Sequence, residues 1–239
     1  TAYFLYFLFS LLEINFWLSI ILAILFSIFI GYIMNLLVYK KLRKRKTSNA
    51  ILLIASVALL TLFESLILIL FGTNIKSLNY IKVTKGLEIL GGIITPLQIF
   101  IILISLILFF LLLIIMKKTK IGKAMRAVSD NKNVAEILGI SSEKIYNYSF
   151  IIGSVIAGIA AILISLEQNI EPIMGTKLII KGFTAAVIGG IGSIHGAILG
   201  AFLLGLAENL GIWFLPSGYK DAIAFIILFI FLIFRPQGI

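Results

Sequence analysis

The residues most suited to ligand chemistry lie in one glycine-rich segment in the last third of the chain. Residues 189–196 read GGIGSIHG, which combines four glycines with a serine and the only histidine. Half-helix N-termini inside a membrane offer unpaired N–H groups and a positive dipole end to a substrate carboxylate. Irregular backbone is tolerated there only where protein or water surrounds it. We therefore predict a substrate pathway formed by Gly189, Gly190, Gly192, Ser193, His195 and Gly196.

The same glycines also match a packing pattern. Gly192, Gly196 and Gly200 recur every four residues, which is the small-xxx-small spacing that lets helices approach closely. Packing is the favoured interpretation for any single glycine in this series. The same packing role is expected for a second column of small residues, Gly153, Ala157 and Ala161.

Three ionisable residues are candidates for functional roles in apolar surroundings. Glu64 and Glu208 lie within apolar runs, where burial of a charge is costly, so a transport role and a structural hydrogen bond are both open for each. His195 could contact a substrate, although a lone histidine is more often structural. Without neighbouring carboxylates or thiolates it forms no metal site.

The sequence lacks the motifs of catalysis. There is no cysteine, no Walker loop, no His-Glu-x-x-His helix and no Gly-x-Ser-x-Gly elbow. We therefore expect no enzyme activity, no cofactor and no metal in this chain. If ATP drives its function, another polypeptide must hydrolyse the ATP.

Composition places these residues in a membrane protein. Hydrophobic residues make up 61% of the chain and charged residues 13%, and the mean hydropathy is +1.17. Residues 16–39, 50–71, 96–116 and 145–166 each have the length of a spanning helix, and Thr95 with Pro96 forms a helix start. The basic runs at 40–46 and 117–126 are predicted to be cytoplasmic. This topology, and not nucleic-acid binding, accounts for the net charge of +10.

The C-terminal part requires a broken helix. Residues 167–181 are predicted to lie outside and Arg235 inside, so an odd number of membrane crossings must join them. Residues 183–214 and 222–234 as two simple spans would give an even number. We therefore predict a break within 189–196, with one arm entering from outside and one returning. The expected fold class is an all-α, polytopic transmembrane bundle with a broken or re-entrant glycine-rich helix.

A short cytoplasmic helix is predicted within residues 129–140. Ser129 or Asp130 is its expected cap and Gly139 its stop. A helix this short is marginal in water, so its apolar stripe must pack on this protein or on a partner. The stripe consists of Val134, Ile137 and Leu138. An ATPase partner would dock here, while a plain connector helix at the membrane surface is the alternative.

Several segments together resemble the permease family of high-affinity branched-chain amino-acid ABC importers. They are residues 122–128 (GKAMRAV), 135–140 (AEILGI), 182–193 (GFTAAVIGGIGS), 196–200 (GAILG) and 235–238 (RPQG). The resemblance covers nearly the whole chain. It implies one permease domain over residues 1–239, preceded by a further N-terminal segment, with a cytoplasmic coupling loop at 117–144. Within that loop, the resemblance assigns ATPase coupling to Val134, Ala135, Glu136, Ile137, Leu138 and Gly139.

The resemblance also implies the partners and the setting. The expected partners are ATP-binding cassette ATPase subunits, a second permease subunit that is identical or different, and an external substrate-binding protein, with membrane lipid around them. The expected location is the cytoplasmic membrane of a prokaryote, with a cytoplasmic C-terminus. Leucine, isoleucine and valine are the implied substrates. Urea, amides or other amino acids remain open, as do a channel and a non-transport scaffold.

Overall fold

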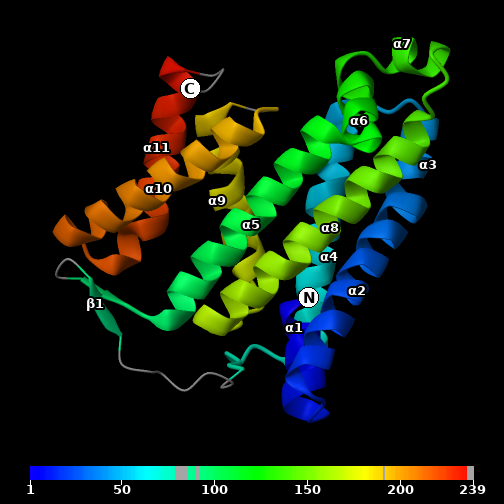
Figure 1. The fold of residues 1–239 in the computed structure, drawn as a ribbon. Helices are drawn as coiled ribbons and strands as arrows, with labels where there is room; N and C mark the ends of the chain where they lie inside the picture. Colours follow the sequence, from blue (N-terminus) through cyan, green and yellow to red (C-terminus); the bar gives the residue numbers. More distant parts are fainter. Residues whose placement is uncertain (79–85, 90–91, 191, 236–239) are drawn as a thin grey trace. The chain divides into compact units, whose positions relative to one another are not determined.

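The computed structural model describes residues 1–78, 86–89, 92–190 and 192–235. The chain divides into two compact units, Thr1–Glu171 and Pro172–Ile239, which we call unit 1 and unit 2. Helices dominate both units (Figure 1). The prediction of one permease domain over residues 1–239 stays a prediction.

Unit 1 begins with two short helical segments and one long helix. The short segments are α1 (Ala2–Tyr6) and the π-helix η1 (Phe7–Leu11). The long helix is continuous through α2 (Phe16–Met34), the π-helical segment η2 (Asn35–Tyr39) and α3 (Lys40–Lys44). The Asn15 side chain caps α2 by accepting a hydrogen bond from the Trp17 N–H. A π-helical segment inside a long helix often marks a functional position.

The next two long helices of unit 1 present their side chains to the outside of the unit. Neither α4 (Asn49–Phe71) nor α5 (Pro96–Lys118) has a buried residue among those described. Thr95 caps α5 and Pro96 lies in its first turn, as predicted, and Gln98 completes a capping box with Thr95. Between the two helices, β1 (Leu87–Ile89) pairs antiparallel with β2 (Gly92–Ile94). Residues 79–85, which include two lysines of the predicted outer loop, lie outside the described residues.

The last helices of unit 1 are α6 (Lys120–Asp130), α7 (Lys132–Ile137) and α8 (Ser142–Glu167). Small residues bring α8 against α2. The Ser27 hydroxyl donates to the Ser154 carbonyl at 3.0 Å, and a Cβ on Gly31 would overlap the Ser154 side chain. The predicted packing column is therefore one residue out of register, because Gly153 and Ala157 are exposed. Spacing identifies a small-residue column but cannot say which column meets the neighbouring helix.

Unit 2 consists of α9 (Met174–Gly189), α10 (Ile194–Phe214), η3 (Ser217–Tyr219) and α11 (Lys220–Phe234). Its three long helices meet in a small apolar core of Ala185, Ile188, Leu204 and Ala224. One residue of the glycine-rich motif (191) and most of the C-terminal RPQG motif (236–238) lie outside the described residues.

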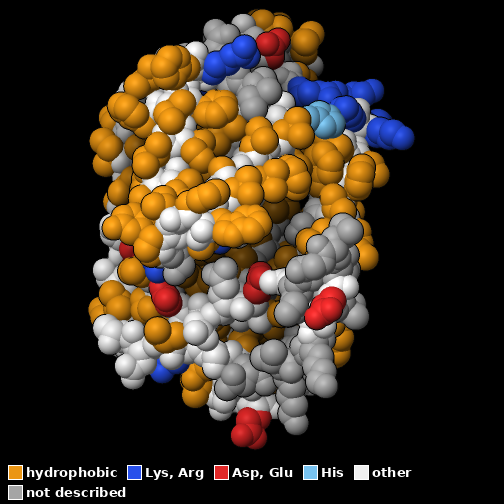
Figure 2. All heavy atoms as spheres, turned by 90° about the vertical axis from the view of Figure 1, so that its left-hand side faces the viewer, with side chains coloured by type: hydrophobic (Ala, Val, Ile, Leu, Met, Phe, Trp, Pro, Cys, Tyr) orange, Lys and Arg blue, Asp and Glu red, His pale blue; other side chains and the backbone are white. Residues whose placement is uncertain are grey.

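Five helices of the described residues are long and apolar enough to cross a membrane. Four are the predicted spans, which the structure extends to Phe16–Lys44, Asn49–Phe71, Pro96–Lys118 and Ser142–Glu167, and the fifth is Ile194–Phe214. Hydrophobic side chains cover much of the upper part of the face seen in Figure 2, while Lys and Arg occur in small groups. Such a surface is suited to lipid and not to water, and the chain is a multi-pass membrane protein.

Candidate functional site

The glycine-rich segment forms the turn of a tight helical hairpin in unit 2. A Cβ on Gly189 would overlap the Gly196 carbonyl, and a Cβ on Gly200 would overlap the Ala185 carbonyl. These pairs fix an antiparallel register between α9 and α10, with backbone against backbone near the turn. The packing interpretation of Gly196 and Gly200 is therefore supported by their contacts.

The turn itself needs glycine for a different reason. Gly190 and Gly192 have φ of +88° and +101°, a region that side chains with a Cβ rarely adopt. Ser193 then caps α10, accepting a hydrogen bond from the Gly196 N–H at 3.0 Å. Gly189, Gly190 and Gly196 are buried, whereas Gly192, Ser193 and His195 are exposed on the surface of the chain.

The helix break is present, but the hairpin changes the argument that led to it. Because α9 and α10 are separate antiparallel helices, they return the chain to the side from which it entered, whether they cross the membrane fully or turn back within it. The number of crossings before Arg235 is then odd in either case. At 1.5 Å per residue, α9 is about 24 Å long, somewhat less than a hydrocarbon core of about 30 Å. The depth of the turn stays a prediction.

The short helix predicted within residues 129–140 is present as α7, and its apolar stripe points away from the core of unit 1. Val134, Ile137 and Leu138 are 50%, 84% and 73% exposed. Ala135 is buried instead and packs with Val128 of α6 and Ile145 of α8. This helix is anchored to unit 1 through a small residue while its large apolar side chains remain outside the core of the unit.

The start of α7 differs from the prediction. Its cap is Asn131, whose side chain accepts hydrogen bonds from the Asn133 and Val134 N–H groups. Ser129 and Asp130, the predicted caps, are instead the last residues of α6. The α6 helix was missed because its basic residues were attributed only to topology, although their spacing is also amphipathic. Gly139 follows α7 with φ of +81°, consistent with its predicted role as a stop.

A polar network joins α7 to the two packed spans of unit 1. The Ser142 hydroxyl donates to the Glu136 carboxylate at 2.6 Å, which connects α7 to the first turn of α8. The next residue, Glu143, accepts two hydrogen bonds from Arg43. Its Oε1 lies 3.3 Å from Nε of Arg43, and its Oε2 lies 3.1 Å from Nη2. Such a bidentate pair fixes orientation as well as charge.

Arg43 is the centre of this network. It stacks over the Tyr146 ring at 4.4 Å and donates to the Asn35 amide oxygen at 2.9 Å. Asn35 is fully buried in η2 and donates in turn to Asn147 of α8. The sequence prediction missed this cluster. The available signal was the pair of asparagines within otherwise apolar spans, since polar groups there require partners.

Replacing Glu143 with Gln is expected to destabilise the α2–α8 pair. The Arg43 side chain is only 13% exposed, so the variant leaves a largely buried guanidinium without its ionic partner. Because Glu143 itself is 35% exposed, we expect a loss of about 1–2 kcal/mol, below that for a fully buried pair. Thermal unfolding of the purified protein in detergent measures it. Asp130→Asn, at an exposed position, is the control, and equal melting of the two variants would contradict the assigned role.

The two candidate carboxylates in apolar runs have different surroundings. Glu64 is half-buried in α4. Glu208 is buried in α10 and forms an ion pair with Lys181 of α9, with 3.0 Å between Nζ and Oε2. No group of three or more potential metal ligands occurs among the residues that the structure describes.

Comparison with known proteins gives a consistent result. The family described as "Branched-chain amino acid transport system / permease component" matches residues 1–232. The high-affinity branched-chain amino acid transport system permease protein BraD of Pseudomonas aeruginosa is 39% identical over 150 residues, covering 62% of this chain and 49% of that protein.

Two further relatives extend the match. The high-affinity branched-chain amino acid transport system permease protein LivH of Escherichia coli K12 is 32% identical over 187 residues, or 70% of this chain and 61% of LivH. The probable branched-chain amino acid transport permease protein LivH of Methanocaldococcus jannaschii is 30% identical over 227 residues, or 88% and 71%. The chain thus spans about half to seven tenths of these relatives. No solved structure matches it.

Proposed function

This chain belongs to the permease-component family of branched-chain amino acid transport systems, and we therefore propose that it forms part of the membrane pathway of an ATP-driven importer for leucine, isoleucine and valine. One observation carries the proposal: the family match extends over residues 1–232 of a chain whose described residues include five candidate spanning helices. In this proposal, ATP is hydrolysed by separate cassette ATPase subunits. An external binding protein delivers the substrate, and a second permease subunit completes the pathway.

The proposed docking element for the ATPase is α7, within the coupling loop at 117–144. Its exposed stripe of Val134, Ile137 and Leu138 supports this role, because three apolar side chains on a surface loop favour a partner's apolar cleft. The Glu136–Ser142 hydrogen bond and the Arg43–Glu143 pair support a mechanical link from α7 to α8 and α2. Movement of α7 with the ATPase would then be transmitted to two packed spans, and the permease would alternate between outward and inward exposure.

The proposed substrate pathway runs along the hairpin turn formed by Gly189, Gly190, Gly192, Ser193, His195 and Gly196. Two arguments support it. The turn interrupts a long apolar segment, and irregular backbone at membrane depth must be enclosed by protein or water. Ser193 and His195 also present polar groups on the surface of the chain beside the turn. We propose that this segment is a broken or re-entrant element.

The proposed orientation follows from the basic ends of the spanning helices. α3 carries Lys41, Arg43 and Lys44 in its last turn, and α5 ends at Lys117 and Lys118. Positive residues beside spans favour the cytoplasmic side, so both ends are assigned to the cytoplasm of a prokaryotic cell. The C-terminus, after Arg235, is assigned to the same side.

Substrate uptake tests this proposal directly. The transporter is expressed with its ATPase and binding protein in a strain that lacks its own branched-chain importers, and uptake of labelled leucine is followed. We expect unlabelled isoleucine and valine to compete and urea and short amides to have no effect. Strong competition by urea or amides with weak competition by isoleucine would assign a different substrate class.

A further inference from the structure

The corner between α5 and α6 gathers exposed lysines from two helices at one end of unit 1. We call them the corner lysines, and they are Lys117 and Lys118 at the end of α5 and Lys120 and Lys123 in the first turn of α6. Residues 89–129 contain no Asp or Glu. The corner therefore has no negative side chain of its own.

Thr119 and Gly122 fix the geometry of this corner. The Thr119 hydroxyl donates to the Ile115 carbonyl at 2.6 Å and accepts from the Gly122 N–H at 3.1 Å. A Cβ on Gly122 would overlap the carbonyl oxygens of Ile115 and Met116. The first turn of α6 therefore lies directly against the last turn of α5, and the corner lysines form one group.

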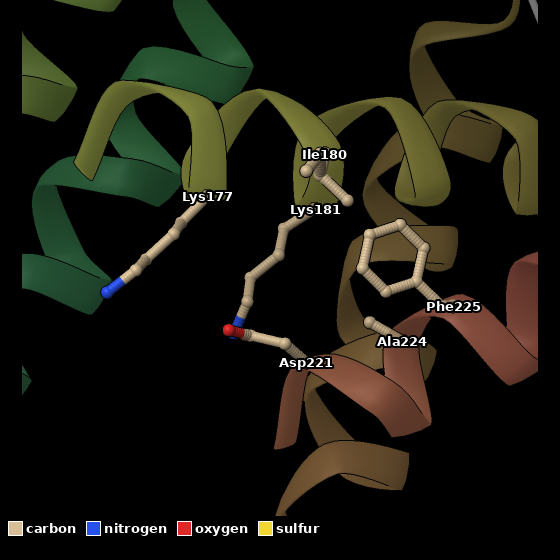
Figure 3. Close-up of a pocket in the computed structure, with 6 residues that line it drawn as sticks. All are labelled: Lys177, Ile180, Lys181, Asp221, Ala224 and Phe225. Carbon is tan, nitrogen blue, oxygen red and sulfur yellow. The ribbon is translucent and has the colours of Figure 1, made fainter. Parts of the chain in front are cut away.

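Several charged residues elsewhere in the chain pair with one another. In unit 2, Lys181 reaches to Asp221 beside a small cavity, with 3.3 Å between Nζ and Oδ1 (Figure 3). In unit 1, Arg43 lies 3.1 Å from Glu143. In the part of the chain that the structure describes, no such pair is formed by the corner lysines. Like charges held together without a counter-charge favour an anionic partner.

The length of α5 places the corner at the membrane surface. α5 has 23 residues, or about 35 Å, which is close to a hydrocarbon core of about 30 Å. Its last residues therefore lie level with the lipid headgroups. The helix Phe16–Lys44 has 29 residues, or about 44 Å, so its basic end extends further from the hydrocarbon. This depth favours lipid over an ATPase subunit as the partner of the corner lysines.

The side chains of the corner also suit lipid. Ile121 is exposed in the same turn as Lys120 and Lys123. An apolar side chain beside lysines lets a surface helix contact acyl carbons while its ammonium groups stay among the headgroups. Lysine binds phosphate as a compact point charge, and basic clusters next to spanning helices attract anionic lipids. Topology alone requires positive charge but not this apolar neighbour.

We propose that the corner lysines bind the phosphate groups of anionic phospholipids, with Ile121 against their upper acyl carbons. In the proposed orientation these lipids belong to the cytoplasmic leaflet. Because α6 packs on α7 through Val128 and Ala135, the bound lipid anchors the loop that carries α7 to the membrane. The inference uses the multi-pass membrane character of the chain and does not depend on the substrate.

Photolabelling of lipid contacts tests this proposal. The assembled transporter is reconstituted into phosphatidylcholine vesicles that contain a trace of phosphatidylglycerol with a diazirine in its headgroup, and labelled peptides are mapped by mass spectrometry. We expect labels within residues 117–123. Unlabelled phosphatidylglycerol should displace them and additional phosphatidylcholine should not. Added salt should weaken the labelling, because it screens exposed charges.

Replacing all the corner lysines with Gln should reduce this labelling tenfold or more, since each lysine beside an anionic surface favours binding by roughly fivefold. Replacing them all with Arg is the matched control, which keeps the charge and should label like the wild type. A cysteine at the exposed Ser129, in a chain without native cysteine, reports whether both variants keep the wild-type orientation. If the Gln variant inserts wrongly, the pair Lys120→Gln with Lys123→Gln replaces it and should still lose labelling severalfold.

The outcomes separate lipid from the alternatives. Equal labelling of the Gln and Arg variants, or displacement by phosphatidylcholine as effective as by phosphatidylglycerol, would overturn the proposal. So would labels confined to other segments, the basic run at 40–46 included. Loss of the ATPase from the Gln variant with unchanged lipid labelling would instead make these lysines an ATPase contact. Failure of leucine uptake by the wild type would affect the proposed function and not this lipid site.

Discussion

Replacing Ile137 and Leu138 together with Asp is expected to abolish copurification of the ATPase with this protein. Both side chains are largely exposed on unit 1, so the change should leave the fold of the chain intact. Each apolar side chain contributes about 1.5–3 kcal/mol when fully buried, and charges in an apolar cleft add a further cost. A loss of about 3–6 kcal/mol weakens binding roughly a hundredfold to ten-thousandfold. Affinity purification of the assembled transporter measures this effect.

The matched control adds the same two charges beside the stripe. Ser129→Asp with Asn133→Asp places both at exposed positions of α6 and α7 without removing an apolar side chain. It should retain the ATPase. Membrane insertion should be normal in both variants, because the basic residues that set orientation are unchanged. If the Ile137 and Leu138 variant retains both the ATPase and substrate-stimulated ATP hydrolysis, α7 is a connector and the coupling assignment is wrong.

Replacing Gly189 or Gly196 with Ala is expected to disrupt unit 2 and abolish transport. At either position the new methyl group would overlap a backbone carbonyl of the opposite helix, which cannot move aside as a flexible side chain would. Overpacking of this kind costs about 1–3 kcal/mol or more even where side chains can adjust. Monodispersity on heating in detergent and leucine uptake are the two measurements.

Two glycines of the same helices provide the controls. A Cβ on Gly182 of α9 or on Gly205 of α10 would meet nothing within 4 Å. Alanine should be tolerated there and should slightly favour the helix, by up to about 1 kcal/mol. If the variants at Gly189 and Gly196 are as stable and active as those at Gly182 and Gly205, the backbone-to-backbone hairpin is wrong.

The helices of the fold were predictable wherever an apolar run was long enough to span a membrane. The four predicted spans correspond to helices because runs of about 20 apolar residues satisfy their backbone only as helices in lipid. The start of α5 at Thr95 and Pro96 was also predictable, because a helix cap depends on neighbours in sequence. The α6 helix was missed because its basic residues were interpreted only as a signal of topology, although they also follow the amphipathic spacing of a helix.

The site was predictable only in part, because local sequence patterns do not show which residues far apart in the chain contact one another. Spacing predicted the stripe of α7 and the glycine column at Gly196 and Gly200. Glu208 was recognised as unusual from its apolar surroundings, but Lys181 could be assigned as its partner only once the antiparallel register was known. The Arg43 network likewise depends on residues about 100 positions apart.

ATP-dependent accumulation of leucine in proteoliposomes tests the central claim most directly. The permease assembly and its ATPase are reconstituted with ATP inside the vesicles, and the binding protein and labelled leucine are added outside. We predict accumulation above the external concentration with ATP, and none with ADP or without the binding protein. Equilibration of leucine to the external level without ATP would indicate a channel. Absence of any entry with all components present would contradict a role in transport.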